Sequence, residues 1–314
     1  MKQKLYVSSS PHLRSGETTQ KIMLDVIIAL MPAAIASVII FGFRSIIVMA
    51  VTIASCVISE YISRKIMKRE NTISDLSAIV TGLLLAFNLP VNINLLIAAF
   101  GGVVAIVVVK QMFGGIGQNF VNPALTARIV LMLSFPTAMT TWTMPFSVDA
   151  VTTATPLAIK ETSNSFLSYF NLFLGIHGGC LGETCTLALI LGGIYLIFRK
   201  IIKPIIPLSY IGTVVFIAIM AGENPIYHLL SGGLLLGAIF MATDYTTSPL
   251  CFAGKLVFGI GCGIFTMIIR LFGSLPEGVS FSIIIMNILV PHIEKLFIPK
   301  AYGENFISQK ERDA

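Results

Sequence analysis

The stretch Leu24-Asp-Val-Ile-Ile-Ala-Leu-Met-Pro-Ala-Ala-Ile-Ala-Ser-Val-Ile-Ile-Phe41 is apolar almost throughout and carries a single charged side chain, Asp25. Its length approaches the roughly 20 residues that a helix needs to cross a bilayer core of about 30 Å. The whole chain shares this character, because 55% of its 314 residues are hydrophobic and 11% are charged. Such a composition leaves too little charge to cover a water-soluble domain of this size. We therefore expect an integral membrane protein.

Further apolar runs follow, and together with the first they predict about ten membrane spans. They lie at 46–62, 76–87, 93–109, 123–135, 187–198, 205–220, 229–241, 256–271 and 279–296. Three runs are short and are bounded by Asn88-Leu-Pro90, Asn122-Pro123 or Asp244. Short helices of this kind resemble the broken helices that line buried cavities in transporters. Thin or tilted helices would give the same pattern.

The basic residues predict the orientation of the chain in the membrane. If every run crosses, most Lys and Arg residues fall on one side, and the other side receives only Arg44, Lys160 and Arg270. The positive-inside rule then places both termini in the cytoplasm and the protein in the inner, cytoplasmic membrane. Residues 1–22 contain no apolar core of signal-peptide length, so we expect a cytoplasmic tail there. The asymmetry accounts for the net charge of +6 without a nucleic-acid partner.

The two halves of the chain resemble each other. Thr81-Gly-Leu-Leu-Leu recurs as Gly232-Gly-Leu-Leu-Leu, and residues 122–136 match residues 277–291 in length and ending. A repeat of five helices, an odd number, places the two copies upside down relative to each other, with a site at the midplane between them. The predicted fold is thus an all-α polytopic membrane protein of two inverted five-helix repeats. The expected parts are the tail at 1–22, a first repeat at 23–135, an external loop at 136–183, a second repeat at 184–297 and a cytoplasmic C-terminal tail at 298–314.

The external loop is long enough to be functional. It holds Trp142 and several Phe and Tyr residues, and its aromatic stretch at 166–176 is expected to lie in the membrane interface or to contact another subunit. It also contains Asp149-Ala-Val-Thr-Thr-Ala-Thr155-Pro, a hydroxyl-rich island in an otherwise oily chain. This island is the best candidate for a site where a chemical group is attached.

The pattern Asp149-x-x-Thr152-x-Ala154-Thr155 resembles the flavinylation motif, Asp-x-x-Ser/Thr-x-Ala-Thr. Three further segments carry the same resemblance. They are Gly114-Gly-Ile-Gly-Gln-Asn119-Phe-Val-Asn122-Pro-Ala, Gly178-Gly-Cys-Leu-Gly-Glu183-Thr-Cys and Met241-Ala-Thr-Asp244-Tyr-Thr-Thr-Ser-Pro249. Over nearly its whole length the chain is similar to the family that includes the D subunit of the Rnf complex, an ion-pumping ferredoxin:NAD oxidoreductase, and the B subunit of the sodium-pumping NADH:quinone reductase.

The resemblance implies FMN joined through its phosphate to the hydroxyl of Thr155 by a flavin transferase. The acceptor must be accessible to that enzyme, and Pro156 favours an extended, projecting conformation at Thr155. Thr152 or Thr153 is the alternative acceptor, since position 153 is Thr where the family more often has Gly. A Thr-rich loop with locally bonded hydroxyls is the structural alternative.

The resemblance also implies a second, noncovalent flavin, riboflavin, near Asn119, Asn122 and Asp244. The alternative for these residues is helix capping. Arg128 is a further candidate because an intramembrane charge is costly and normally has a partner. It could hold the flavin, pair with an Asp or a neighbouring subunit, or extend to the interface. Glu183 fits the family's Gly-x-Gly-Glu segment, or it could favour a helix N-terminus.

The remaining ionisable residues give no sign of a metal centre. The acidic residues Asp25, Glu60 and Asp75 lie at the ends of predicted helices, where we expect them to be interfacial. The five cysteines have no Cys-x-x-Cys spacing, so an iron–sulfur site is not expected. Cys180 and Cys185 are expected to be small packing residues rather than a pair.

The sequence therefore predicts a membrane electron-transfer subunit, and not a complete enzyme, in an ion-translocating ferredoxin:NAD oxidoreductase. The resemblance implies other membrane and peripheral subunits as partners, including a second subunit with covalent FMN. Two alternatives are a solute channel or transporter on the same inverted-repeat scaffold and a quinone-reducing subunit.

Overall fold

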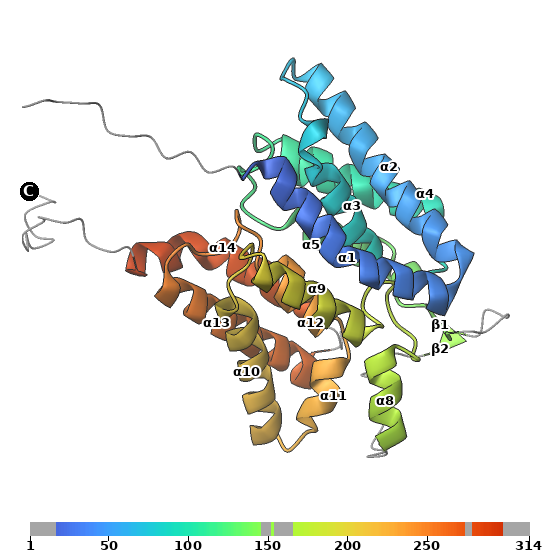
Figure 1. The fold of residues 1–314 in the computed structure, drawn as a ribbon, viewed down its shortest axis with the longest axis vertical. Coiled ribbons are helices and arrows are strands. Elements are labelled where there is room, and N and C mark those ends of the chain that lie inside the picture. Colours follow the sequence, from blue (N-terminus) through green and yellow to red (C-terminus); the bar gives the residue numbers. More distant parts are fainter. Residues whose placement is uncertain (1–16, 146–151, 154–165, 274–277, 298–314) are drawn as a thin grey trace, which may run out of the picture.

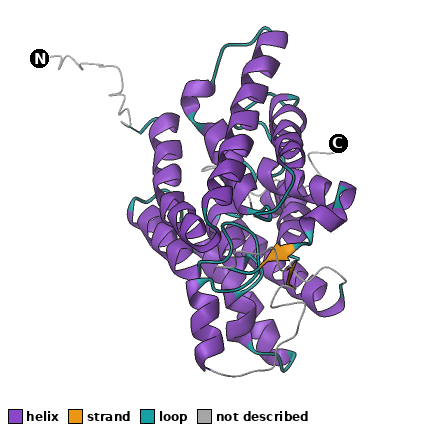
Figure 2. Cartoon of the chain, turned by 90° about the vertical axis from the view of Figure 1, so that its right-hand side faces the viewer, coloured by secondary structure: helices purple, strands orange, loops and turns teal. Residues whose placement is uncertain are grey.

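The structure, a computed structural model, describes residues 17–145, 152–153, 166–273 and 278–297. Across these ranges the chain is mostly helical, with one small two-stranded ladder (Figures 1 and 2). Four of these helices are apolar enough and long enough to cross a membrane. They are α1 (Thr19–Phe41), α2 (Phe43–Ile66), α13 (Phe252–Phe272) and α14 (Val279–Phe297). The prediction of an all-α polytopic membrane protein is confirmed.

The other predicted spans coincide with shorter helices or with helices that continue as π-helix. They are α3 (Ser77–Phe87), α4 (Leu95–Val103) continuing as η2 (Val104–Gln111), α5 (Pro123–Ser134), α9 (Thr186–Phe198), α10 (Ile205–Met220) and α12 (Leu234–Leu236) continuing as η3 (Gly237–Met241). The short elements are η1 (Ile73–Asp75), α6 (Pro136–Met139), β1 (Trp142–Thr143), β2 (Thr152–Thr153), α8 (Phe166–Leu174) and α11 (Pro225–Leu230). That all ten runs cross the membrane stays a prediction.

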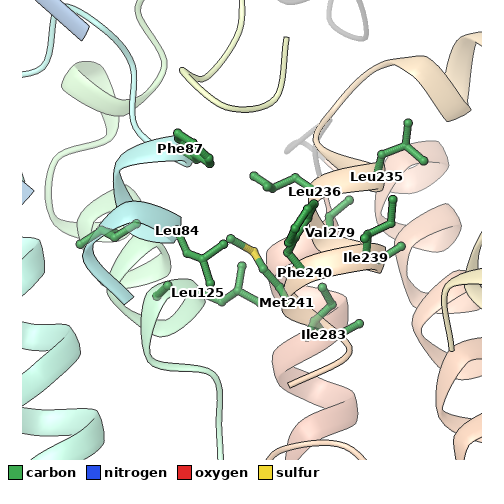
Figure 3. Packing of buried hydrophobic residues seen from close by; sticks show 14 of the residues in the cluster. Leu84, Phe87, Leu125, Leu235, Leu236, Ile239, Phe240, Met241, Val279 and Ile283 are labelled. Atoms are coloured by element: carbon green, nitrogen blue, oxygen red, sulfur yellow. The ribbon is translucent and has the colours of Figure 1, made fainter. Parts of the chain in front are cut away.

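The two halves of the chain meet through corresponding helices. In the first half α1 packs against α9 of the second, and α5 packs against α14. These are the first and fifth helices of each predicted repeat, and two copies related by an axis between them would meet in this way. Figure 3 shows part of the shared core, where Leu84 and Leu125 from the first half lie beside Met241 from the second. The inverted repeat itself stays a prediction.

The third helix is broken inside the protein, as the sequence predicted at Asn88. Because α3 stops at Phe87, its last carbonyls need partners that lipid cannot supply. Segment 180–182, which precedes α9 in the chain, provides them. The backbone N–H of Gly182 donates to the carbonyl of Phe87 at 3.0 Å, and that of Leu181 donates to the carbonyl of Leu89 at 3.1 Å. The broken end of α3 is thus closed by the segment that leads into α9.

Gly182 allows this contact because it has no side chain. A Cβ added at Gly182 would overlap the buried ring of Phe87. We therefore expect Gly182→Ala to destabilise the protein by about 1–3 kcal/mol, the usual cost of overpacking a core. Thermal unfolding of the purified protein in detergent measures the effect. Gly212→Ala in α10 is the matched control, because nothing lies within 4 Å of an added Cβ there. Equal melting temperatures for the two variants would contradict this account of segment 180–182.

Different elements lie at the two ends of the helical bundle. The N-terminal end of α1 and the C-terminal end of α14 lie toward the same edge of the molecule, whereas the β1–β2 ladder lies near the opposite end of α1 (Figure 1). The helix α5 begins near the start of α1, since Pro123 and Thr19 line one cavity, and it is followed in the chain by α6 and β1. Its 12 residues correspond to a length of about 18 Å. The ladder and the N-terminal end of α1 are therefore well separated.

Candidate functional site

A cavity of about 400 Å³ lies between the two halves, at the end of the bundle where α1 begins. One wall is apolar and comes from α1, α3, α9 and η3. It includes Met23, Val26, Val80, Leu196 and Phe240. A volume of this size lies within the range of small-molecule and cofactor sites, which are also mostly apolar. The cavity has room for a flat ring system.

The polar part of the cavity contains three of the predicted site residues. Asn119 and Asn122 come from the segment before α5, and Asp244 comes from the segment after η3. These residues are far apart in the sequence, and the packing of the two halves brings them to one cavity. Their amide and carboxylate groups, with the hydroxyls of nearby Thr residues, can bond the heteroatoms of a bound ring and a hydroxylated chain.

Asn122 also caps a helix, so the structural alternative for this residue is confirmed. Its side-chain oxygen accepts from the backbone N–H groups of Ala124 at 3.1 Å and Leu125 at 3.3 Å. Its amide nitrogen donates to the carbonyl of Met241 at 3.3 Å. Asn122 therefore fixes the start of α5 against the end of η3, and in doing so it shapes the cavity.

Asp244 is held by its own loop. The hydroxyls of Thr246 and Thr247 donate to its carboxylate at 3.1 Å and 3.4 Å. Burial raises the pKa of the Asp244 carboxyl above its ordinary value, while these hydrogen bonds act in the opposite direction. The Asp244 carboxylate can accept hydrogen bonds from a ligand, and its protonated form could also donate one.

A buried ion pair, which the sequence did not predict, adjoins the cavity. The Nζ atom of Lys110 donates to the two carboxylate oxygens of Glu60 at 3.1 Å and 3.0 Å and to the hydroxyl of Ser77 at 2.7 Å. Lys110 and Ser77 line the cavity. The expectation that Glu60 is interfacial was wrong, because its exposed fraction is 1%. A single sequence does not show that Lys110 lies opposite Glu60. The only available signal of a buried charge was the position of Lys110 between two apolar runs.

Asp25 was also wrongly expected at the interface. It is buried in α1, and its carboxylate accepts from the hydroxyl of Tyr195 at 2.8 Å and from the guanidinium of Arg199 at 3.0 Å. This ion pair joins α1 to the end of α9. The two carboxylates were misplaced for one reason, namely that their partners come from helices distant in the sequence.

Arg128 lies away from the cavity, so it does not join the other three candidates for the second flavin. Its guanidinium donates to the side-chain oxygen of Asn88 at 2.7 Å, to the hydroxyl of Ser280 at 3.2 Å and to the sulfur of Cys180 at 3.4 Å. Arg128 is therefore buried at the broken end of α3. Cys180 is a free thiol at this position, as is Cys185 nearby.

Glu183 lies near the N-terminus of α12, and not near that of α9, which follows it in the chain. Its carboxylate lies against Gly233, which precedes α12. Gly233 has a φ of 65°, a conformation that favours glycine. A negative charge near the positive end of a helix is favourable. Glu183 is buried, and it lies within the electrostatic reach of Arg128 and Arg270. Glu183, Arg128 and Arg270 therefore lie near one another in the interior of the protein.

The predicted flavinylation motif is described only in part. Thr152 and Thr153 form β2, which pairs antiparallel with β1 so that Thr152 lies opposite Thr143 and Thr153 opposite Trp142. Trp142 is buried, so the ladder is anchored to the bundle. Asp149, Ala154 and Thr155 lie outside the described residues. The expectation of FMN on Thr155 stays a prediction.

These features define a class of protein, a helical membrane protein with a cavity and charged networks enclosed between two halves. The sequence model of the NQR2, RnfD, RnfE family matches residues 6–303, and the chain belongs to this family. The resemblance stated from the motifs is thereby confirmed.

Several relatives are similar over almost their whole length. The chain is 46% identical to the D subunit of the Na⁺-translocating ferredoxin:NAD⁺ oxidoreductase complex of Acetobacterium woodii, covering 98% of each chain. It is 43% identical to the D subunit of the proton-translocating ferredoxin:NAD⁺ oxidoreductase complex of Clostridium ljungdahlii, covering 95% of this chain and 96% of the relative. It is 36% identical to the D subunit of the ion-translocating oxidoreductase complex of Stutzerimonas stutzeri, covering 92% and 93%.

Proposed function

We propose that the chain is the D subunit of an ion-translocating ferredoxin:NAD oxidoreductase complex and that it carries electrons between other subunits on two flavins. Identity of 46% and 43% over nearly the whole chain with proteins of that name supports the assignment. These names favour it over the alternatives of a solute transporter and a quinone-reducing subunit. The NAD site then belongs to another subunit, because the sequence contains no credible dinucleotide fingerprint. The proposal places the ferredoxin site on another subunit as well.

The first flavin is FMN, joined through its phosphate to Thr155. The motif supports this site, and so does the position of β2, which holds Thr152 and Thr153 at one end of the bundle; the proposed acceptor follows Thr153 by two residues in the chain. In the predicted orientation both termini are cytoplasmic and this end faces outward, where a flavin transferase and a second subunit with covalent FMN can reach it. When bound, a flavin supplies reversible electron uptake, and the protein supplies its position and surroundings.

The second flavin is riboflavin, held in the cavity between the two halves. The single observation that carries this proposal is the convergence of Asn119, Asn122 and Asp244 on a cavity of about 400 Å³. The apolar wall excludes water from a ring, and the polar residues orient it. In the predicted orientation this cavity lies near the cytoplasmic side. The two flavins then occupy opposite ends of α5.

The test is the flavin content of the purified chain, expressed in cells that possess a flavin transferase. We expect an intact mass that exceeds the unmodified value by one phosphate-linked FMN. We also expect about one riboflavin per chain to be released when the protein is denatured. An unmodified mass together with no released flavin would contradict the electron-carrier function and would favour a transporter. A modified mass with no released flavin would remove only the second site.

A further inference from the structure

We propose that Lys110 is a positioning residue that sets the redox potential of the flavin in the cavity, with Glu60 holding its ammonium group in place. This inference rests on the proposed function, because it assumes the second flavin. Lys110 is buried, with an exposed fraction of 3%, and it lines the cavity together with Ser77. Among the described residues, it is the only Lys or Arg that lines this cavity.

The orientation of the ion pair determines which of its two charges lies nearer to the cavity. Lys110 lines the cavity, whereas Glu60 is absent from the lining. The positive end of the pair therefore faces the cavity and the negative end lies behind it. Three further groups surround the pair. Gln111 donates to Glu60 at 2.9 Å, Thr72 donates to Glu60 at 3.0 Å, and Ser77 accepts from Lys110 at 2.7 Å.

The local backbone brings these side chains together. The segment from Val104 to Gln111 is π-helix, and its consecutive residues Val109, Lys110 and Gln111 are all buried. π-Helical turns are rare and are frequently found at functional sites. Here the π-helix turns both Lys110 and Gln111 toward Glu60. A regular helix would move Lys110 and Gln111 out of this register.

A purely structural role explains this pair poorly. Burying two charges is expensive, and well-packed apolar residues of similar volume often give equal or greater stability. Ionisable residues inside membrane proteins usually mark functional sites. The hydrogen bonds of the Lys110 ammonium group are already made to Glu60 and Ser77. Its remaining influence on the cavity is its charge.

That charge has a defined effect on a flavin. The ring gains negative charge when it is reduced, and a cation at the cavity wall stabilises the reduced form relative to the oxidised form. Within a protein, a single charge across a cavity changes such a ratio by about tenfold. We therefore expect Lys110 to raise the midpoint potential of the second flavin. Removing the charge of Lys110 should change the midpoint potential of the flavin strongly and the amount of flavin bound only weakly.

The experiment measures the potential of the noncovalent flavin by spectroelectrochemical titration of the full chain, with the covalent FMN as an internal reference. The double variant Glu60→Gln/Lys110→Met removes the pair without leaving a buried charge alone. Because the Glu60 charge behind Lys110 cancels part of the lysine's effect, we expect removal of both charges to favour the oxidised form by about threefold, a decrease of about 15 mV for a two-electron couple. The potential of the covalent FMN should stay unchanged.

Two controls separate charge from structure. The double variant Asp25→Asn/Arg199→Gln neutralises another ion pair of the same 3.0 Å length, whose arginine is half exposed, and we expect no change in potential. Lys110→Arg keeps the charge and should keep the potential. An unchanged potential in Glu60→Gln/Lys110→Met would overturn the proposal, and so would equal decreases in both double variants or an equally large decrease in Lys110→Arg.

The remaining outcomes are also decisive. If Glu60→Gln/Lys110→Met still carries covalent FMN but takes up no added riboflavin, the pair is structural and the proposal fails. If this variant does not fold, Glu60→Gln/Lys110→Gln takes its place, because its amides can still hydrogen-bond to each other and to Ser77; the same decrease in potential is expected, and an unchanged potential would overturn the proposal. Absence of noncovalent flavin from the wild type would instead contradict the second flavin of the proposed function, before any variant is compared.

Discussion

Thr155→Val is expected to abolish the covalent flavin completely. Valine has nearly the same shape as threonine but has no hydroxyl, so no phosphoester can form at position 155. The measurement is flavin fluorescence of the protein band after denaturing electrophoresis, because a noncovalent flavin is lost under those conditions and a covalent one is retained. Wild-type protein co-expressed with a flavin transferase should fluoresce, and Thr155→Val should not.

The neighbouring threonines provide matched controls for this result. Thr153→Val and Thr152→Val remove hydroxyls from β2, which precedes position 155. We expect Thr153→Val to retain full fluorescence. Thr152 belongs to the motif that the transferase recognises, so Thr152→Val should reduce the yield without changing the acceptor. Fluorescence that persists in Thr155→Val and disappears in Thr153→Val would move the attachment site to Thr153.

The helices could be predicted because each long apolar run in the sequence coincides with a helix. The run at 205–220 matches α10, and the run at 123–135 differs from α5 by one residue. Asn122-Pro123 marked the start of α5 correctly, since Asn is a favoured cap and Pro fits the first turn. The π-helices could not be predicted. Nothing in a run of Val and Ile residues distinguishes η2 from a regular helix.

The candidate site was predictable only where family motifs mark it. Asn119, Asn122 and Asp244 were grouped correctly because the motifs and the broken helices indicated the same region. Glu60 and Asp25 were placed wrongly, because burial of a carboxylate depends on a partner from a distant helix. Arg128 was grouped with the flavin because an intramembrane charge needs a partner, but sequence spacing does not show which partner it has.

Arg128→Ala is expected to destabilise the protein by about 3 kcal/mol or more. Removing the buried Arg128 guanidinium leaves its hydrogen-bond partners unsatisfied, which costs about 1–3 kcal/mol for each buried group. Here Asn88 and Ser280 lose a donor, and the buried carboxylate of Glu183 loses a nearby positive charge. The measurement is the thermal unfolding of the purified protein in detergent.

Arg44→Ala is the matched control for this prediction. Arg44 is exposed at the start of α2 and donates to the carbonyl of Ile93 at 3.3 Å. Surface substitutions usually change stability by about 0.5 kcal/mol or less, so Arg44→Ala should unfold close to the wild-type temperature. Similar melting temperatures for Arg44→Ala and Arg128→Ala would contradict a central role for the Arg128 network.

The same variant also tests where the second flavin lies. Because Arg128 contacts Asn88, Ser280 and Cys180 and does not line the cavity, the fraction of Arg128→Ala that folds should release as much riboflavin per chain as the wild type. If Arg128 held the flavin, the milder variant Arg128→Lys would lose riboflavin while its melting temperature changed little. Stability and flavin content therefore separate the two roles of this arginine, and the structure predicts that only stability changes.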